Sequence, residues 1–138
     1  DGDGEQEDVF AAVADLKNRG QVMIELSGYS FGTWVNALCA ASRLPGIPMT
    51  MVAPPAAFID FGAVPQLAGL YSVITGGRDD IAPPDMLKRL TAHWNPAARL
   101  VILSGADHFF MGYLEDLTTR LARVIKAAAA EDSRARIL

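Results

Sequence analysis

The sequence lacks the residues and segments on which several classes of protein depend. It has one cysteine, Cys39, so no disulfide can form within the chain, which is compatible with a reducing cytoplasm. No apolar run reaches the roughly 18 residues of a membrane span. Neither a P-loop nor a G-x-G-x-x-G motif is present, and two histidines with one cysteine make no typical zinc site. We therefore expect no metal and no cofactor.

The length of the chain indicates the number of domains, and its net charge limits the classes of partner. The chain has 138 residues, which suits a single domain spanning 1–138, and about half of them are apolar, enough for a buried core. The net charge of −4 argues against nucleic acid or an anionic membrane as the main partner. The first residues, DGDGEQED, are acidic and do not resemble a signal peptide. We expect a small-molecule substrate and a cytoplasmic location.

Hydrophobic spacing predicts helices that alternate with short apolar strands. The expected helices span about 5–18, 31–42, 84–93 and 113–130, and the expected strands about 22–27, 48–53, 70–75 and 98–104. This alternation predicts the α/β class, with a parallel sheet of about four strands flanked by helices. The loop over 54–69 is where a lid or a substrate wall is expected.

A serine lies between two glycines where the first strand meets the second helix. Residues 28–32 read GYSFG, which fits the nucleophile elbow G-x-S-x-G in its strand-to-helix context. Such a tight turn exposes the oxygen of Ser30, and side chains at Gly28 and Gly32 are expected to clash with nearby backbone. The N–H of Phe31 is placed to stabilise an oxyanion. The alternative is that Ser30 is an ordinary helix N-cap.

A serine nucleophile needs a base and an acid that orients the base. His108 lies in SGADHFF after the fourth strand, whereas His93 lies in a helical stretch and is expected on the surface or in packing. The acid candidates after the third strand are Asp79 and Asp80. All these loops follow strands of a parallel sheet, so they are expected to meet at one edge, and the chain order is the Ser, Asp, His order known for elbow serines.

The chain resembles the α/β-hydrolase superfamily, and more narrowly the small bacterial dienelactone-hydrolase-like predicted esterases. The resemblance lies in GEQEDVFAAVADL, GYSFG, APP, GGRDDIAPP and GADHFF, and it covers nearly the whole chain. It implies Ser30 as nucleophile and His108 as base. Asp79 is implied as the acid because the family loop reads roughly G-x-x-D-x-x-x-P. Tyr29 and Phe109 are expected to contact substrate, and the implied reaction is hydrolysis of small esters or thioesters.

One departure from the family concerns the start of the chain. Family members begin with further strands, whose loop gives a second oxyanion donor. The strand expected at Val22 to Ser27 therefore becomes an exposed edge, open to self-association or to a complementary chain. The chain is expected to be a piece of a split enzyme, a minimal form completed by dimerisation, or a fragment. The competing hypothesis is a non-catalytic half-domain that needs a partner.

Overall fold

The computed structural model describes residues 2–135 and contains one parallel sheet between layers of helices. The strands are β1 (Leu26–Tyr29), β2 (Met49–Val52), β3 (Leu70–Gly76) and β4 (Arg99–Leu103), in the spatial order β1-β2-β3-β4. The helices are α1 (Asp3–Asn18), α2 (Phe31–Ser42), α3 (Pro84–Trp94) and α4 (Leu114–Ala135). The predicted α/β class and four-stranded parallel sheet are confirmed.

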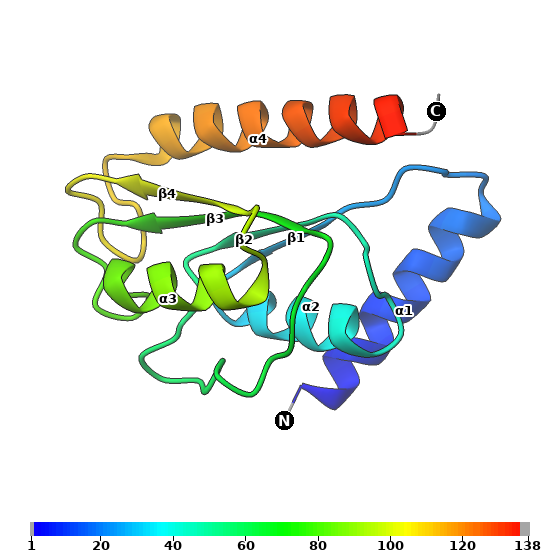
Figure 1. Ribbon diagram of the computed structural model, residues 1–138, viewed down its shortest axis with the longest axis horizontal. Coiled ribbons are helices and arrows are strands. Elements are labelled where there is room, and N and C mark those ends of the chain that lie inside the picture. The colour runs from blue at the N-terminus through cyan, green and yellow to red at the C-terminus, as the bar shows by residue number, and fades with distance from the viewer. Residues whose placement is uncertain (1, 136–138) are drawn as a thin grey trace.

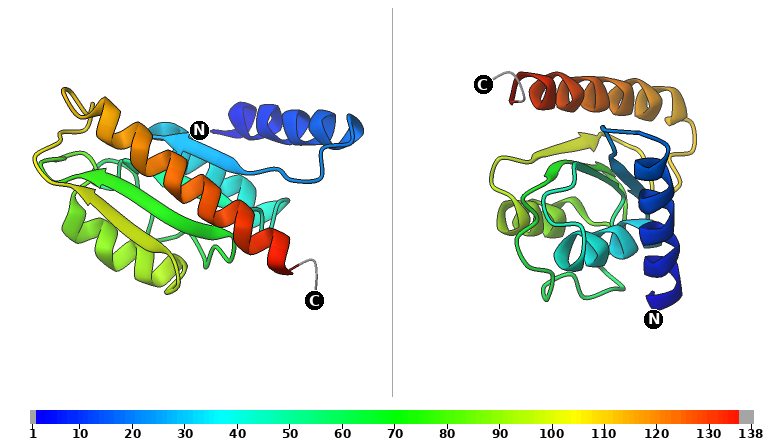
Figure 2. Two further views of the ribbon diagram at one scale, coloured as in Figure 1. Left: turned by 90° about the horizontal axis from the view of Figure 1, so that it is seen from above. Right: turned by 90° about the vertical axis from the view of Figure 1, so that its right-hand side faces the viewer.

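The helices cover both faces of the sheet. Helices α2 and α3 lie on one face and α4 crosses the other (Figures 1 and 2), while α1 packs against α2. Because β2 and β3 are covered on both faces, they are nearly continuously buried, and Met49, Met51, Val73 and Ile74 have no exposed surface. Among residues 2–135, no helix has both the length and the apolar character that crossing a membrane requires.

The first strand differs from its prediction. It begins at Leu26 rather than Val22 and continues to Tyr29. The reason lies in the neighbouring strand. The segment before β2 turns through Pro45 and Gly46, so pairing begins where Leu26 N donates to Pro48 O at 2.9 Å. An apolar run alone does not form a strand without a partner ladder.

The long loop before β3, where a lid or a substrate wall is expected, places several apolar side chains in the core. Phe61 in this loop is 1% exposed, and its ring contacts Trp34 and Trp94 edge-on at 5.1 and 5.5 Å between centroids. Phe58 alone among its large apolar side chains is well exposed. Cys39 is fully buried on α2, as predicted for a small hydrophobe.

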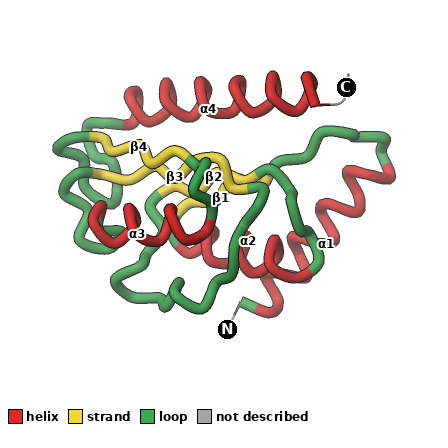
Figure 3. Tube along the Cα trace, viewed as in Figure 1, coloured by secondary structure: helices red, strands yellow, loops and turns green. Residues whose placement is uncertain are grey.

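The carboxyl end of the sheet gathers the loops that carry the candidate residues. Strands β3 and β4 are parallel neighbours, so their following loops leave the sheet together (Figure 3). Arg78 N in the first loop donates to Ala106 O in the second at 2.9 Å. Gly76 permits this approach, because a Cβ there would lie 2.3 Å from Ala106 O. These loops are therefore joined through their backbones.

Candidate active site

Ser30 occupies a strained turn between β1 and α2. Its φ of 50° lies in the left-handed region, where residues other than glycine are uncommon. Surrounding hydrogen bonds hold it there: Ser30 N donates to Val52 O at 2.9 Å, and Thr33 donates to Ser30 O from both its N–H (3.0 Å) and its Oγ1 (2.6 Å). Such conformations persist only where neighbouring structure over-determines them, typically at functional sites.

The side chain of Ser30 does not cap the helix that follows it. No hydrogen bond runs from its hydroxyl to the first turn of α2. Its Oγ lies instead 3.0 Å from Nε2 of His108, and this histidine is 78 positions further along the chain. The interpretation of Ser30 as an ordinary N-cap is therefore wrong.

The two elbow glycines have different surroundings, although a clash was expected at both. A Cβ at Gly28 would lie 2.6 Å from Gly32 O and 2.8 Å from Thr33 N, so the strand packs directly against the first turn of α2. A Cβ at Gly32 would meet no heavy atom within 4 Å. The expectation for Gly32 is wrong because this position faces an open cleft beside the elbow.

This difference predicts opposite effects of two alanine substitutions. Gly28→Ala is expected to lower the free energy of unfolding by roughly 1–3 kcal/mol, because the new methyl group must displace helix backbone. Gly32→Ala is expected to raise it by up to about 1 kcal/mol, since alanine is the better helix former. Urea unfolding measures the free energy of unfolding of both variants and of the parent chain. Equal losses at both positions would contradict the described elbow packing.

Asp79 is the acid candidate that faces the histidine. It is 2% exposed in the loop after β3, whereas Asp80 is exposed. Its Oδ1 accepts hydrogen bonds from Ile81 N at 2.9 Å and Ala82 N at 2.7 Å. Two backbone donors stabilise the negative charge of a buried carboxylate and fix its orientation. The family pattern thus selected the buried member of the pair.

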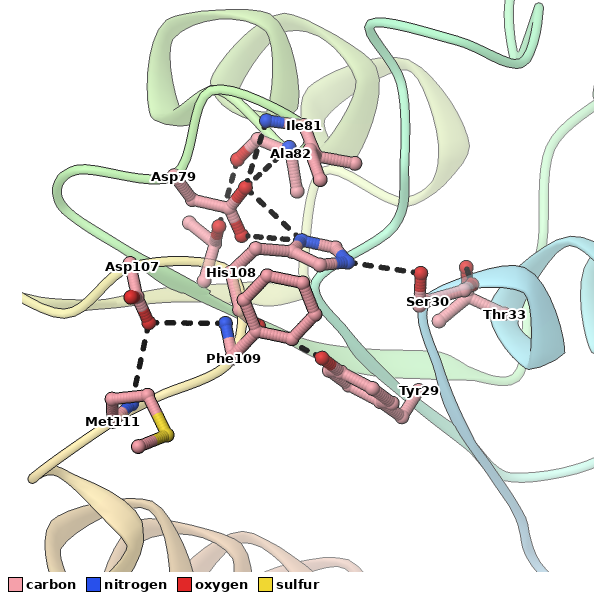
Figure 4. Close-up of polar contacts among 11 residues, drawn as sticks. Tyr29, Ser30, Thr33, Asp79, Ile81, Ala82, Asp107, His108, Phe109 and Met111 are labelled. Atoms are coloured by element: carbon pink, nitrogen blue, oxygen red, sulfur yellow. Dashed lines mark hydrogen bonds and ion pairs between the residues drawn. The ribbon is translucent and has the colours of Figure 1, made fainter.

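His108 connects the acid to the serine (Figure 4). It is 7% exposed, and its Nδ1 lies 3.0 Å from Asp79 Oδ2 and 3.1 Å from Oδ1. With the imidazole proton on Nδ1, facing the carboxylate, Nε2 is left to accept from Ser30 Oγ. The structure therefore brings the three residues predicted from the sequence into one hydrogen-bonded chain.

The remaining predicted site residues surround this chain. Tyr29 is 47% exposed and its ring centroid lies 5.6 Å from that of His108. Phe109 is 64% exposed and contacts the His108 ring edge-on at 5.5 Å. Phe31 is the first residue of α2, and a helix leaves its first N–H groups without intrahelical acceptors.

Two further polar residues, His93 and Asp107, lie outside the hydrogen-bonded chain of Asp79, His108 and Ser30. His93 is exposed and contacts Val64 O through its Nε2 at 3.3 Å. Asp107 was not predicted, yet its Oδ1 accepts from Phe109 N at 3.1 Å and Met111 N at 3.2 Å and so shapes the histidine loop. The sequence GADHFF could have indicated this role, because aspartate side chains commonly accept hydrogen bonds from the backbone two residues further on in turns. Over residues 2–135, no cluster of three or more His, Cys, Asp or Glu side chains is suited to a metal ion.

Two clefts accompany the strand that leads to the serine. The cleft beside the elbow has a volume of about 350 Å³, and its lining includes Gly28, Tyr29 and Phe31 with Glu5 and Asp8 of α1. A larger cavity of about 660 Å³ lies at the opposite end of the sheet, where residues 21–25 and 43–48 precede β1 and β2. The smaller cleft borders Tyr29 and Phe31, the neighbours of Ser30 in sequence, but the lining of neither cleft includes Ser30, Asp79 or His108.

Comparison with known proteins identifies the fold. No family model and no curated protein matches the sequence. Among solved structures, an α/β serine hydrolase homologue from Coxiella burnetii shares 31% identity at a TM-score of 0.78, covering 89% of this chain and 59% of that one. An α/β serine hydrolase without a lid from Xanthomonas campestris shares 31% identity at a TM-score of 0.79, covering 91% and 57%.

A third structure is more distant in sequence but similar in fold. A protein of unknown function from Agrobacterium tumefaciens, described as a putative α/β hydrolase, shares 23% identity at a TM-score of 0.74, covering 97% of this chain and 62% of that one. The chain thus spans less than two thirds of the length of each of these three structures. The resemblance predicted from GYSFG and GADHFF is confirmed, and in its fold this chain belongs with the α/β serine hydrolases.

Proposed function

We propose that this chain carries the catalytic residues of a serine hydrolase that cleaves small carboxylic esters or thioesters through an acyl-enzyme. One observation carries the proposal: Asp79, His108 and Ser30 form a continuous hydrogen-bonded chain with contacts of 3.0–3.1 Å. The strained φ of the serine supports it. The two structures at 31% identity, both described as serine hydrolases or homologues, point the same way.

In the proposed acylation step, Ser30 Oγ attacks the carbonyl carbon of the ester. A carbon–oxygen bond forms while His108 Nε2 takes the hydroxyl proton, and the carbonyl electron pair moves onto oxygen. The Asp79 carboxylate orients the imidazole and stabilises its positive charge. The tetrahedral intermediate then expels the alcohol or thiol, which leaves with the proton from His108.

In the proposed deacylation step, water attacks the acyl group on Ser30. His108 Nε2 takes a proton from the water and returns it to Ser30 Oγ as the carboxylic acid departs. The N–H of Phe31 is the proposed oxyanion donor in both steps, because it follows the serine at the start of α2. Removing one donor from an oxyanion hole typically costs about 10²–10³ in rate, so a second donor matters for full activity.

Small substrates suit the surroundings of the serine. Tyr29 and Phe109 are the proposed substrate contacts, because both side chains have exposed surface and both border the His108 ring. Cys39 is free and buried, which is compatible with the reducing cytoplasm proposed as its setting.

Within the described sheet, the unpaired edge of β1 favours a second candidate function. Among the strands of residues 2–135, β1 pairs with β2 on one side only, and it leads directly into the serine. The chain also spans 57–59% of the two hydrolase structures at 31% identity. The alternative proposal is an incomplete half-domain that needs a complementary chain or a second copy along β1 to complete its sheet and oxyanion hole.

Hydrolysis of p-nitrophenyl acetate, measured across a size-exclusion profile, tests both proposals. The hydrolase proposal predicts turnover that co-elutes with the chain and saturates with substrate. Turnover confined to an oligomer peak would favour completion by a second copy. A folded chain at every concentration without turnover would contradict the hydrolase proposal and favour the half-domain.

A further inference from the structure

The segment that carries His108 is held at several points. On its N-terminal side, Ala106 O accepts from Arg78 N at 2.9 Å, which ties the segment to the acid loop. Within the segment, the Asp107 carboxylate accepts from two backbone N–H groups further along. These contacts fix the shape of the loop and its distance from Asp79, but neither joins it to the strand that carries the serine.

The hydroxyl of Tyr29 makes that connection. Tyr29 is the last residue of β1, directly before Ser30. Its hydroxyl donates to the backbone carbonyl of His108 at 3.0 Å, across 79 positions of sequence. Its ring also lies 5.6 Å from the imidazole and 6.5 Å from the buried ring of Phe110, between centroids. Figure 4 shows the phenol reaching from the serine strand toward the histidine loop.

We propose that Tyr29 is a positioning residue, whose hydroxyl ties the His108 backbone to the serine strand and so sets the distance between His108 Nε2 and Ser30 Oγ. This inference rests on the proposed hydrolase function and adds a role to the substrate contact proposed for the same side chain. The Tyr29 hydroxyl donates its proton to the backbone carbonyl of His108 in a hydrogen bond. It therefore acts through His108 and does not itself exchange a proton with substrate.

The environment of the phenol suits a permanent donor. Burial of part of the side chain raises the pKa of Tyr29, and the carboxylates of Asp79 and Asp107 raise it further. The hydroxyl therefore keeps its proton throughout the range in which a neutral histidine serves as base. Small displacements of a catalytic group have large effects, since a shift of about 1 Å can cost on the order of 10² in rate.

Tyr29→Phe is the direct test, because it removes the hydroxyl and keeps the ring. We expect kcat for p-nitrophenyl acetate to fall about 10-fold or more while KM stays within about twofold. The control is Tyr113→Phe, at the far end of the same loop, whose hydroxyl lies beside Gly105. This control is expected to keep both kinetic constants. A role in substrate contact alone predicts the opposite split, a raised KM with kcat unchanged.

A measurement that needs no activity separates this inference from the proposed function. The proton on His108 Nδ1, shared with Asp79, is followed by NMR in a His93→Gln background so that one histidine remains. We expect a sharp downfield signal in the parent chain and in Tyr113→Phe, and a broadened one in Tyr29→Phe.

The outcomes distinguish the two proposals. An inactive parent chain whose signal still broadens in Tyr29→Phe overturns the hydrolase proposal and leaves the Tyr29 contact supported. An active parent chain with unchanged kcat and an unchanged signal in Tyr29→Phe overturns the positioning role.

Discussion

Replacing Asp79 with Asn is expected to lower the rate of ester hydrolysis about 10⁴-fold, the size of effect seen when the acid of a serine triad becomes an amide. The neighbouring Asp80→Asn variant is expected to stay within about twofold of the parent chain, because substitutions at exposed positions away from a site rarely matter. The two substitutions make the same chemical change at adjacent positions. They differ in that Asp79 is buried against His108 and Asp80 is exposed.

The hydrogen bonds around Asp79 explain why an amide fails there. Its Oδ1 accepts from Ile81 N and Ala82 N, so the amide oxygen of an asparagine takes that side. The amide NH₂ then faces His108 Nδ1 and donates to it. An imidazole that accepts at Nδ1 carries its proton on Nε2, where it can no longer accept the proton of Ser30.

The comparison of initial rates for Asp79→Asn and Asp80→Asn, with thermal midpoints measured beside them, checks this prediction. Both variants should remain folded at the assay temperature. A large loss in Asp80→Asn with near-parental rates in Asp79→Asn would reverse the assignment of the acid. Similar rates in both variants would remove Asp79 from the mechanism.

Ser30→Ala is expected to reduce ester hydrolysis by about 10⁴-fold or more, because it removes the atom that forms the acyl-enzyme. The hydroxyl makes no hydrogen bond within α2, and the backbone contacts that hold the elbow do not involve it. Its loss should therefore leave the fold intact. Steady-state turnover and circular dichroism of the purified variant measure the two effects separately.

Ser27→Ala is the matched control for this substitution. Ser27 lies on β1, the strand that leads to Ser30. It is exposed and donates to Glu25 at 3.1 Å, away from the histidine. It is expected to keep parental activity. Comparable turnover in Ser30→Ala and Ser27→Ala would mean that the esterase activity does not pass through the elbow serine.

The elbow was readable from the sequence because its geometry demands particular residues. The motif at 28–32, with an apolar run before it and helical spacing after it, predicted where Ser30 would lie. Strand alternation predicted that the loops of Asp79 and His108 would meet it. The residues alone left Asp79 and Asp80 as equal candidates, since their difference is one of burial and adjacent positions in a turn share the same composition.

Other features depended on contacts that no local pattern contains. The start of β1 is set by where Pro48 lets the neighbouring strand begin pairing. The free space beside Gly32 depends on the cleft next to α1. The hydrogen bond between Tyr29 and the His108 carbonyl joins segments 79 positions apart. Each is a long-range effect of packing, so local propensity could not predict it.

Mass spectrometry of the chain after reaction with a fluorophosphonate shows whether Ser30 is an activated nucleophile. This probe phosphonylates a serine that an adjacent histidine activates, and it does not require efficient turnover. We expect a single adduct on Ser30 of the parent chain and none in Ser30→Ala. A folded parent chain that acquires no adduct, or acquires one on another serine, would contradict the proposal that Ser30, His108 and Asp79 act together as a catalytic unit.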